Sequence, residues 1–336
     1  MDGPPVRDHG TADPGAPTRM APAGTIKRQR PPEALDAPVT AVDDVYLIGH
    51  FGIAQVPPDT WRLRVDGRVA RPLELDLDGL RAMSSTTVTA VLECYGNPLR
   101  PREPTRRAGN VVWRGTPVSA VLDRAGAEGE LLWARGHDSG VFDGRPCTEY
   151  LKDLPLAVVR ERGVLAYEMN GEPLTAEHGF PVRLFVPGYF GTNNVKWLRS
   201  LTVADRRAEH LFTTELYQRP SATGALRPVR DLDVNSLVTA VRRDGRTLHV
   251  AGWAWGSSEV VGVEVGVLGD DEAWVPAELG RPAGSRYAWR RFGATVPAAG
   301  VRRVRARARD AAGARQPLTG DRNACHVVDV ESGNAT

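Results

Sequence analysis

A cysteine at the end of a predicted strand is the first residue of this sequence that could carry chemistry. Cys94 closes a β-branched, mostly apolar run over residues 86–94, and the turn-forming residues Tyr95-Gly96-Asn97-Pro98 follow it. A thiol held at a strand end beside a glycine turn can reach a metal ion or a substrate. A buried, inert thiol is the commoner state of a free cysteine, and the residues alone leave both interpretations open.

Basic side chains and glycine turns gather around a second buried run, over residues 181–188. His178 and Arg183 lie at its start, and Lys196 follows it after one further glycine, Gly191. An arginine fork, a lysine charge and the N–H groups of a turn together suit an anionic, phosphate-bearing ligand. The alternative is a satisfied polar network that holds a loop in place, and both interpretations remain open.

The elements that must position these residues mix strands with short helices. Residues 61–67 alternate apolar and polar side chains before a turn, which predicts a half-buried strand. Residues 118–126 predict a helix that ends at Gly126. The sequence contains neither a GxGxxG nor a GxxxxGKS/T motif, and its elements follow no strict βαβ order. A Rossmann or P-loop nucleotide site is therefore excluded.

The composition and the hydrophobic pattern of the sequence change after about residue 220. Residues 220–233 are rich in small and turn-forming residues and predict a linker. Evenly spaced short strands with Asp-Gly and Gly-Asp turns follow, and they predict an all-β immunoglobulin-like sandwich over residues 234–330. The predicted strands are residues 237–241, 247–253, 260–267, 287–292 and 303–309. The last of them alternates arginine with small apolar residues, so its arginine face is either solvated or directed at a partner.

Composition limits the class of protein. Residues 1–42 are rich in proline and lack a periodic apolar pattern, so we predict a flexible arm. The 336-residue chain has a formal charge of +2, which gives no indication of nucleic-acid binding. No apolar run approaches the roughly 18 residues that a membrane span needs. Three cysteines cannot form a disulfide framework, and an odd number favours a reducing compartment, so we expect a cytoplasmic protein.

Several motifs together resemble the sulfite oxidase family of molybdenum-cofactor oxidoreductases. They are Cys94-Tyr95-Gly96-Asn97, LAYEMNGEPL over residues 165–174, HGFPVR over residues 178–183 and VKWL over residues 195–198. The resemblance covers about residues 43–330. It implies an α+β protein, with a mixed α/β molybdopterin-binding domain of sulfite oxidase type over residues 43–219 and an immunoglobulin-like dimerisation domain after it. It also implies two-electron oxygen-atom transfer on a molybdenum-molybdopterin cofactor, with sulfite as the default substrate.

The resemblance further implies roles for individual residues. Cys94 would ligate molybdenum through its thiolate, since a soft sulfur donor suits this redox metal. Tyr167 matches an active-site tyrosine of the family. The residues that match positions holding the pterin and its phosphate are His50, Asp138, His178, Arg183, Asn194, Val195 and Lys196.

One family motif is altered in this chain. The family pattern of an aromatic residue, any residue and then Arg-Asn-His reads Tyr46-Leu47-Ile48-Gly49-His50 here. Without the guanidinium, a dianionic substrate loses a charge-assisted contact worth about 1.5–3 kcal/mol. The change points to a less charged or bulkier substrate, such as an organic sulfur or nitrogen compound. Five arginines follow Cys94, and either one of them enters the pocket as a replacement charge or all are solvated loop residues: Arg100, Arg102, Arg106, Arg107 and Arg114.

The partners follow from the same resemblance. The sequence shows no haem-binding module, so electrons are expected to pass to or from a separate acceptor or donor. The C-terminal domain is expected to form a homodimer, because it carries no chemical motif of its own. A reductase of an oxidised sulfur or nitrogen group is an alternative on the same cofactor, because oxygen-atom transfer runs in both directions. A cofactor-free scaffold protein is the alternative from another class.

Overall fold

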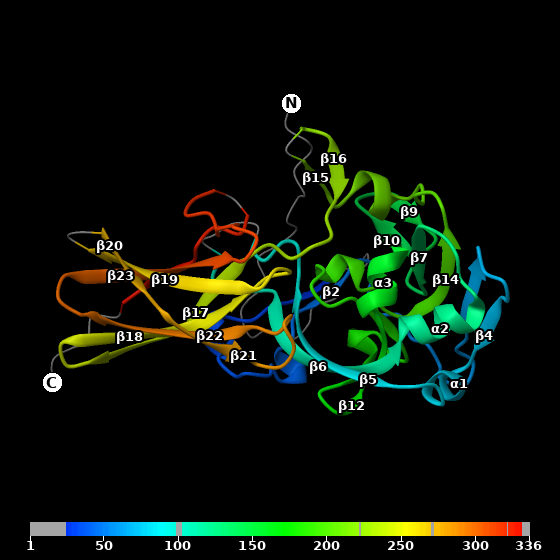
Figure 1. Ribbon diagram of the computed structural model, residues 1–336, viewed down its shortest axis with the longest axis horizontal. Helices are drawn as coiled ribbons and strands as arrows, with labels where there is room; N and C mark the ends of the chain where they lie inside the picture. The colour runs from blue at the N-terminus through cyan, green and yellow to red at the C-terminus, as the bar shows by residue number, and fades with distance from the viewer. Residues whose placement is uncertain (1–24, 99–102, 222, 270–271, 321, 331–336) are drawn as a thin grey trace.

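The computed structural model describes residues 25–98, 103–221, 223–269, 272–320 and 322–330. Its two halves lie side by side along the long axis (Figure 1). Within these residues, the N-terminal half holds all three α-helices, and the C-terminal half is built from strands. The predicted order of a mixed domain followed by an all-β sandwich is confirmed. Among the helices described, none is long and apolar enough to cross a membrane.

The outer sheet of the N-terminal half has the strand order β10-β7-β14-β3-β4, and only β14 and β3 run parallel. Alternating side chains of these strands point inward onto helices α1, α2 and α3, which form one apolar core with them. Helix α2 ends as predicted, because Gly126 takes the left-handed conformation with φ of 62°. The bounds are β3 Leu63–Gly67, β4 Leu73–Leu75, β7 Leu131–Gly136, β10 Leu151–Pro155, β14 Leu198–Ala204, α1 Leu77–Arg81, α2 Val118–Ala125 and α3 Leu156–Arg162.

The inner sheet has the order β12-β11-β6-β5, with β13 also paired to β11. Strand β11 contributes one face to the core shared with the outer sheet and the opposite face to a second apolar cluster. A separate hairpin of β8 and β9 stands beside these sheets. The bounds are β5 Thr86–Glu93, β6 Ala108–Pro117, β8 Gly140–Phe142, β9 Arg145–Cys147, β11 Val164–Met169, β12 Glu172–Pro173 and β13 Arg183–Phe185.

The described part of the proline-rich segment corrects the prediction of a flexible arm over residues 1–42. Strand β1 (Ile26–Arg28) pairs antiparallel with β2 (Leu47–Gly49), so its backbone has hydrogen-bond partners in the neighbouring strand. Ile26 and Leu35 are each only 1% exposed, and Leu35 packs into a cluster with tryptophans of the C-terminal half. Two well-placed apolar side chains therefore anchor a segment whose composition indicated disorder. Residues 1–24 of the predicted arm lie outside the described residues.

The described residues of the predicted linker, 220–221 and 223–233, are also ordered. Strands β15 (Gln218–Pro220) and β16 (Leu226–Pro228) form a hairpin. Val229 and Leu232 then become buried against Trp253 and Trp289 of the following domain. The end of the connection is thus packed through Val229 and Leu232, whereas Leu226 in the hairpin is 69% exposed.

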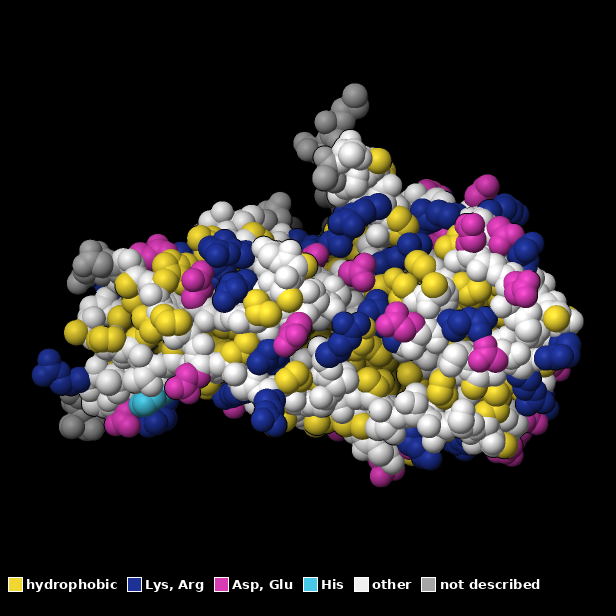
Figure 2. Space-filling model, viewed as in Figure 1, with side chains coloured by type: hydrophobic (Ala, Val, Ile, Leu, Met, Phe, Trp, Pro, Cys, Tyr) yellow, Lys and Arg dark blue, Asp and Glu magenta, His cyan; other side chains and the backbone are white. Residues whose placement is uncertain are grey.

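The C-terminal half is a sandwich of two four-stranded antiparallel sheets, ordered β17-β18-β22-β21 and β20-β19-β23-β24. In β23, Val304, Ala306 and Ala308 face the core, whereas Arg305 and Arg307 point outward and pair with Glu272 and Glu264. On the face in Figure 2, basic side chains are interspersed with acidic ones, without one basic patch. The bounds are β17 Asn235–Asp244, β18 Thr247–Trp255, β19 Val260–Gly269, β20 Glu272–Pro276, β21 Glu278–Pro282, β22 Arg290–Pro297, β23 Val301–Asp310 and β24 Val327–Asp329.

Candidate active site

A pocket opens where strand β5 ends at the Cys94 turn. It collects side chains from the N-terminal ribbon, the inner sheet, the loop after β7 and the loops around β13. Seven of the nine residues predicted from the sequence line it: His50, Cys94, Asp138, His178, Arg183, Asn194 and Lys196. The rest of its wall is Tyr46, Leu47, Ile48, Gly49, Leu92, Tyr150, Gly191, Thr192 and Tyr217.

Hydrogen bonds hold the Cys94 turn rigidly at the end of β5. The backbone N–H of Cys94 donates to the carbonyl of Arg107 at 2.9 Å. The Asn97 side chain accepts from the Arg107 N–H at 2.5 Å, and the Arg107 guanidinium donates to the Gly96 carbonyl at 2.6 Å. Burial raises the pKa of the Cys94 thiol, while the nearby Arg107 charge opposes that rise. The turn therefore presents a sulfur in a fixed place beside a cation.

Glu93, the residue before Cys94, was not singled out by sequence reasoning. Its carboxylate is 1% exposed and accepts hydrogen bonds from Asn97 at 3.0 Å, Asn235 at 2.7 Å and the Trp255 indole at 2.8 Å. Asn235 and Trp255 belong to the sandwich, so the carboxylate joins the pocket strand to the other domain. The one feature of the sequence that could have marked Glu93 is that it is an acidic residue inside an otherwise apolar strand.

The cationic end of the pocket lies at Arg183 and Lys196. The Arg183 guanidinium donates to the carbonyls of His178 at 3.0 Å and Asn194 at 3.2 Å, whereas its Nε has no hydrogen-bond partner. Burial and the Arg183 charge lower the pKa of His178 to about 3 and that of Lys196 to about 7. The buried Arg183 cation, an amine at Lys196 that an anion would help to keep protonated, and a neutral imidazole form a site that favours an anionic ligand.

Asp138 faces Lys196 across the pocket. Burial raises the pKa of its carboxyl to about 6, and the Lys196 charge only partly offsets that effect. Its Oδ1 atom is buried without a hydrogen-bond partner. Gly136 makes this approach possible, because a Cβ there would lie 2.4 Å from Asp138 Oδ1 and 2.8 Å from the Lys196 carbonyl oxygen. The carboxyl is thus positioned to bind a group that the protein itself does not supply.

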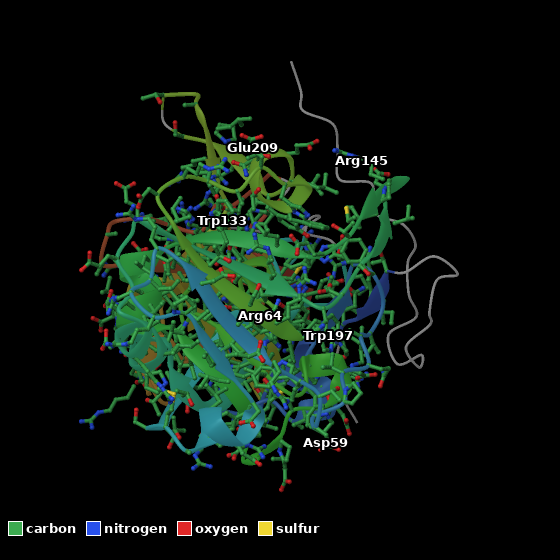
Figure 3. The ribbon with its side chains drawn as sticks, turned by 90° about the vertical axis from the view of Figure 1, so that its right-hand side faces the viewer. Asp59, Arg64, Trp133, Arg145, Trp197 and Glu209 are labelled. Carbon is green, nitrogen blue, oxygen red and sulfur yellow. The ribbon has the colours of Figure 1, made fainter. Side chains whose placement is uncertain are left out.

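His50 lies within an aromatic cage on the other side of the pocket. Its Nε2 is 2.7 Å from the Tyr217 hydroxyl, and its ring stacks on Tyr150 at a centroid distance of 5.3 Å. Phe142 of the β8–β9 hairpin contacts the same ring, and Figure 3 shows Arg145 of this hairpin at the edge of the molecule. Burial and three lysine charges lower the pKa of His50 to about 3. The imidazole is therefore neutral and can accept or donate a hydrogen bond.

The prediction for Tyr167 was wrong. Tyr167 is 3% exposed in the core shared with the outer sheet, and the Arg81 guanidinium lies 5.3 Å from its ring. Successive side chains of a strand point to opposite faces, and Tyr167 shares with Leu165 the face that points away from the pocket. The tyrosines that line the pocket are Tyr46, Tyr150 and Tyr217.

Val195 was predicted to hold the cofactor but does not line the pocket, and neither do the described arginines Arg106, Arg107 and Arg114. The Val195 side chain is buried in the core, and only its carbonyl acts near the site, accepting from the Leu184 N–H at 2.9 Å. Arg107 borders the Cys94 turn, whereas Arg114 pairs with Glu168 on the surface. Arg106 is buried and donates to the carbonyls of Glu103 and Thr105. Arg100 and Arg102 lie outside the described residues.

Comparisons with known proteins identify this arrangement. The family described as Oxidoreductase molybdopterin binding domain matches residues 50–212. The sulfite oxidase of Arabidopsis thaliana is 30% identical over 327 residues, which cover 83% of this chain and 82% of that protein. The chain belongs to the sulfite oxidase family. The mitochondrial sulfite oxidase of Drosophila melanogaster is 29% identical over 300 residues, covering 77% of this chain and 50% of the relative. The chain thus spans about half the length of that relative.

A solved structure resembles this sulfite oxidase family member over most of its length. The sulfane dehydrogenase SoxCD from Paracoccus pantotrophus matches with a TM-score of 0.79 at 26% sequence identity, over 93% of this chain and 88% of that one. The match extends over both domains of the fold.

The pocket fits the cofactor of the sulfite oxidase family. In the described part of the chain, no group of three or more His, Cys, Asp or Glu side chains could hold a metal ion by itself. A metal there needs ligands from an organic cofactor in addition to the Cys94 thiolate. Asp138 Oδ1 and Arg183 Nε are buried polar atoms without partners, an acceptor and a donor that a pterin and its phosphate would satisfy. Lys196 and His178 complete this polar wall.

Proposed function

We propose that this protein is a molybdenum-cofactor-dependent oxidoreductase that catalyses two-electron oxygen-atom transfer. The observation that carries the proposal is the position of the Cys94 thiol, which lines the same pocket as the cations Arg183 and Lys196. When bound, the cofactor supplies the transferable oxygen atom and accepts or donates the two electrons. Cys94 would hold the metal through its thiolate.

In this proposal, the residues of the chain bind and orient the cofactor and the substrate, and they keep water out of the pocket. Arg183, Lys196 and His178 would hold the phosphate end of the cofactor, and Asp138 would accept a hydrogen bond from its ring system. Tyr150 donates its hydroxyl proton to the Thr192 carbonyl at 2.7 Å, which fixes the hydroxyl oxygen at the pocket wall. Its hydroxyl oxygen can then accept a hydrogen bond from a substrate or cofactor group, and we infer that Tyr150, not Tyr167, is the tyrosine of the active site.

Sulfite is the first substrate to test, because the pocket is cationic. The second candidate is an organic sulfur or nitrogen compound. Ile48 favours it, since it places apolar surface in a pocket wall that also includes Tyr46 and Tyr217. The same cofactor would serve a reductase of such a compound. We further propose a homodimer and a separate electron-transfer partner.

Metal and pterin content test the proposed function. The wild-type chain, expressed in a host that makes the cofactor, is expected to contain close to one molybdenum and one pterin per chain. Cys94→Ser should lose most of the molybdenum, because a hydroxyl is a poor ligand for this soft site. Cys147→Ser is the matched control, since Cys147 lies on β9 and does not line the pocket.

Three outcomes separate the hypotheses. Folded wild-type protein without metal or pterin contradicts the enzyme proposal and supports a scaffold protein. Full metal content in Cys94→Ser contradicts the assigned ligand. Loaded wild-type enzyme that reduces an artificial acceptor with an organic sulfur substrate, but not with sulfite, selects the second candidate.

A further inference from the structure

The hairpin of strands β8 and β9 lies beside the aromatic cage around His50 and belongs to neither sheet. Within the described residues, its two strands pair with each other and with no other strand. Asp143 and Gly144 form its turn, and both have a left-handed backbone, with φ of 49° and 76°. Such a two-residue turn has the twist of the strands that it joins, so the hairpin is a compact unit. A two-stranded unit depends on its surroundings for stability.

One contact that holds the hairpin in place is the ring of Phe142, at the end of β8. This ring lies edge-on to His50 at a centroid distance of 5.1 Å and is tilted against Phe212 at 5.4 Å. His50 lines the candidate pocket and is itself 5.0 Å from Phe212. Val141 points the opposite way and is half exposed, because side chains alternate along a strand. Phe142 therefore covers one side of His50, and the outer face of the hairpin meets solvent.

A second contact is an ion pair at the start of β9. Arg145, labelled in Figure 3, donates to both carboxylate oxygens of Glu215, at 2.5 Å and 2.8 Å. Glu215 ends the short helical turn Leu211–Glu215, which also carries Phe212. Both side chains of the pair are half exposed, and an ion pair of that kind contributes little and is weakened by salt. The hairpin is thus fastened to the turn before Tyr217, a residue of the pocket wall.

We propose that the β8–β9 hairpin is a flap over the His50 side of the pocket and that the Arg145–Glu215 ion pair is its latch. The hairpin moves as one piece, because its tight turn keeps the two strands paired. Opening costs little, since the latch is exposed and Phe142 packs only at the edge of the core. Opening withdraws Phe142 from His50 and gives a ligand access to the aromatic wall of the pocket. The use of this opening to admit substrate rests on the proposed function, whereas the opening itself does not.

Alkylation of Cys147 measures the opening without turnover. Cys147 ends β9, and its side chain is partly buried against the core of the N-terminal half. Iodoacetamide should therefore modify it faster when the hairpin lifts, and peptide mass spectrometry separates it from Cys94 and Cys325. Arg145→Met and Glu215→Gln each remove the latch in the molybdenum-loaded enzyme. Each should speed alkylation per thiolate about twofold to fivefold, as expected when one exposed ion pair is lost.

The two latch variants have opposite effects on the thiol itself. Burial raises the pKa of Cys147, the Arg145 charge lowers it and the Glu215 charge raises it. Losing Arg145 therefore reduces the thiolate fraction, and losing Glu215 increases it. The pH dependence of alkylation gives this fraction for each variant, so the rates can be compared per thiolate. An acceleration per thiolate that is absent from either variant overturns the inference.

Arg114→Met is the matched control, because Arg114 donates to both carboxylate oxygens of Glu168 on the inner sheet. It removes the same charge and should leave alkylation of Cys147 unchanged. Added salt should speed this reaction in the wild type but not in Arg145→Met, where no latch remains to be screened. Equal acceleration in Arg114→Met and Arg145→Met contradicts the latch, as does a salt effect that persists in Arg145→Met.

Turnover tests the role of the flap in admitting substrate. Since substrate enters the open form, kcat/KM of the two latch variants should rise by the same factor as alkylation, with kcat unchanged. Faster alkylation with an unchanged kcat/KM refutes this role. Absence of molybdenum from the wild type refutes the proposed function instead, and the alkylation rates then still decide whether the hairpin opens.

Discussion

Replacing Glu93 with glutamine should lower the stability of the protein and weaken the coupling between its two domains. Glutamine can keep its oxygen toward Asn97 and Asn235, but its amide then faces the Trp255 indole N–H, which lies 2.8 Å from the present carboxylate. Losing one hydrogen bond to a buried charged group costs about 1.5–3 kcal/mol. Burial raises the pKa of Glu93, so removing the charge recovers part of that cost. We expect a net loss of about 2 kcal/mol.

Thermal unfolding measures this loss. A change of about 2 kcal/mol lowers Tm by roughly 4–8 °C in domains of this size. Because Glu93 bonds to residues of β17 and β18, the Glu93→Gln transition should also broaden or divide into two. Glu168→Gln is the control, since Glu168 pairs with Arg114 near the surface, where an ion pair contributes about 1 kcal/mol or less. Equal Tm values for the two variants, each with one sharp transition, would refute the reasoning.

Two other predictions concern the pocket. Tyr150→Phe should lower kcat about tenfold or more by removing a positioned hydroxyl, whereas Tyr167→Phe should leave kcat near the wild-type value. Steady-state kinetics with the best substrate compares the two variants. A larger loss of kcat in Tyr167→Phe than in Tyr150→Phe would reinstate Tyr167 as the active-site tyrosine. The raised pKa of Asp138, about 6 against an ordinary 3.8, means that its contribution to stability is present below pH 3.8 and is lost as the pH rises through 6. Asp138→Asn should therefore flatten the Tm of the cofactor-free protein between pH 4 and 6, and an unchanged pH profile would contradict this environment for Asp138.

The sequence was most informative where residues close to one another in the chain decide the local structure. A β-branched run followed by a glycine turn predicts a strand end, and the structure has Cys94 there. Gly126 predicts a helix end because few other residues adopt a left-handed conformation. Regular alternation also predicted five of the eight strands of the sandwich (β17, β18, β19, β22 and β23), since one face of each must be apolar, but not β20, β21 and β24.

Composition and motif matching failed where contacts between residues far apart in the chain decide which side chains are buried and which face the pocket. Residues 25–42 have a disordered composition, yet Ile26 and Leu35 are buried because other parts of the chain supply their partners. Tyr167 lies within a matched motif, but the pairing of β11 turns it into the core. Tyr217, which no motif marked, reaches His50 from 167 residues away.

The sequence by itself therefore predicted the family, the order of the domains and seven residues of the pocket, because its motifs resemble those of a known family. The tertiary structure alone decided which tyrosines face the pocket, that Glu93 joins the domains, and that Phe142 contacts His50. The physical reason is that a strand offers two faces. Which face meets the site depends on register with a partner strand, and that register is set by packing across the whole fold.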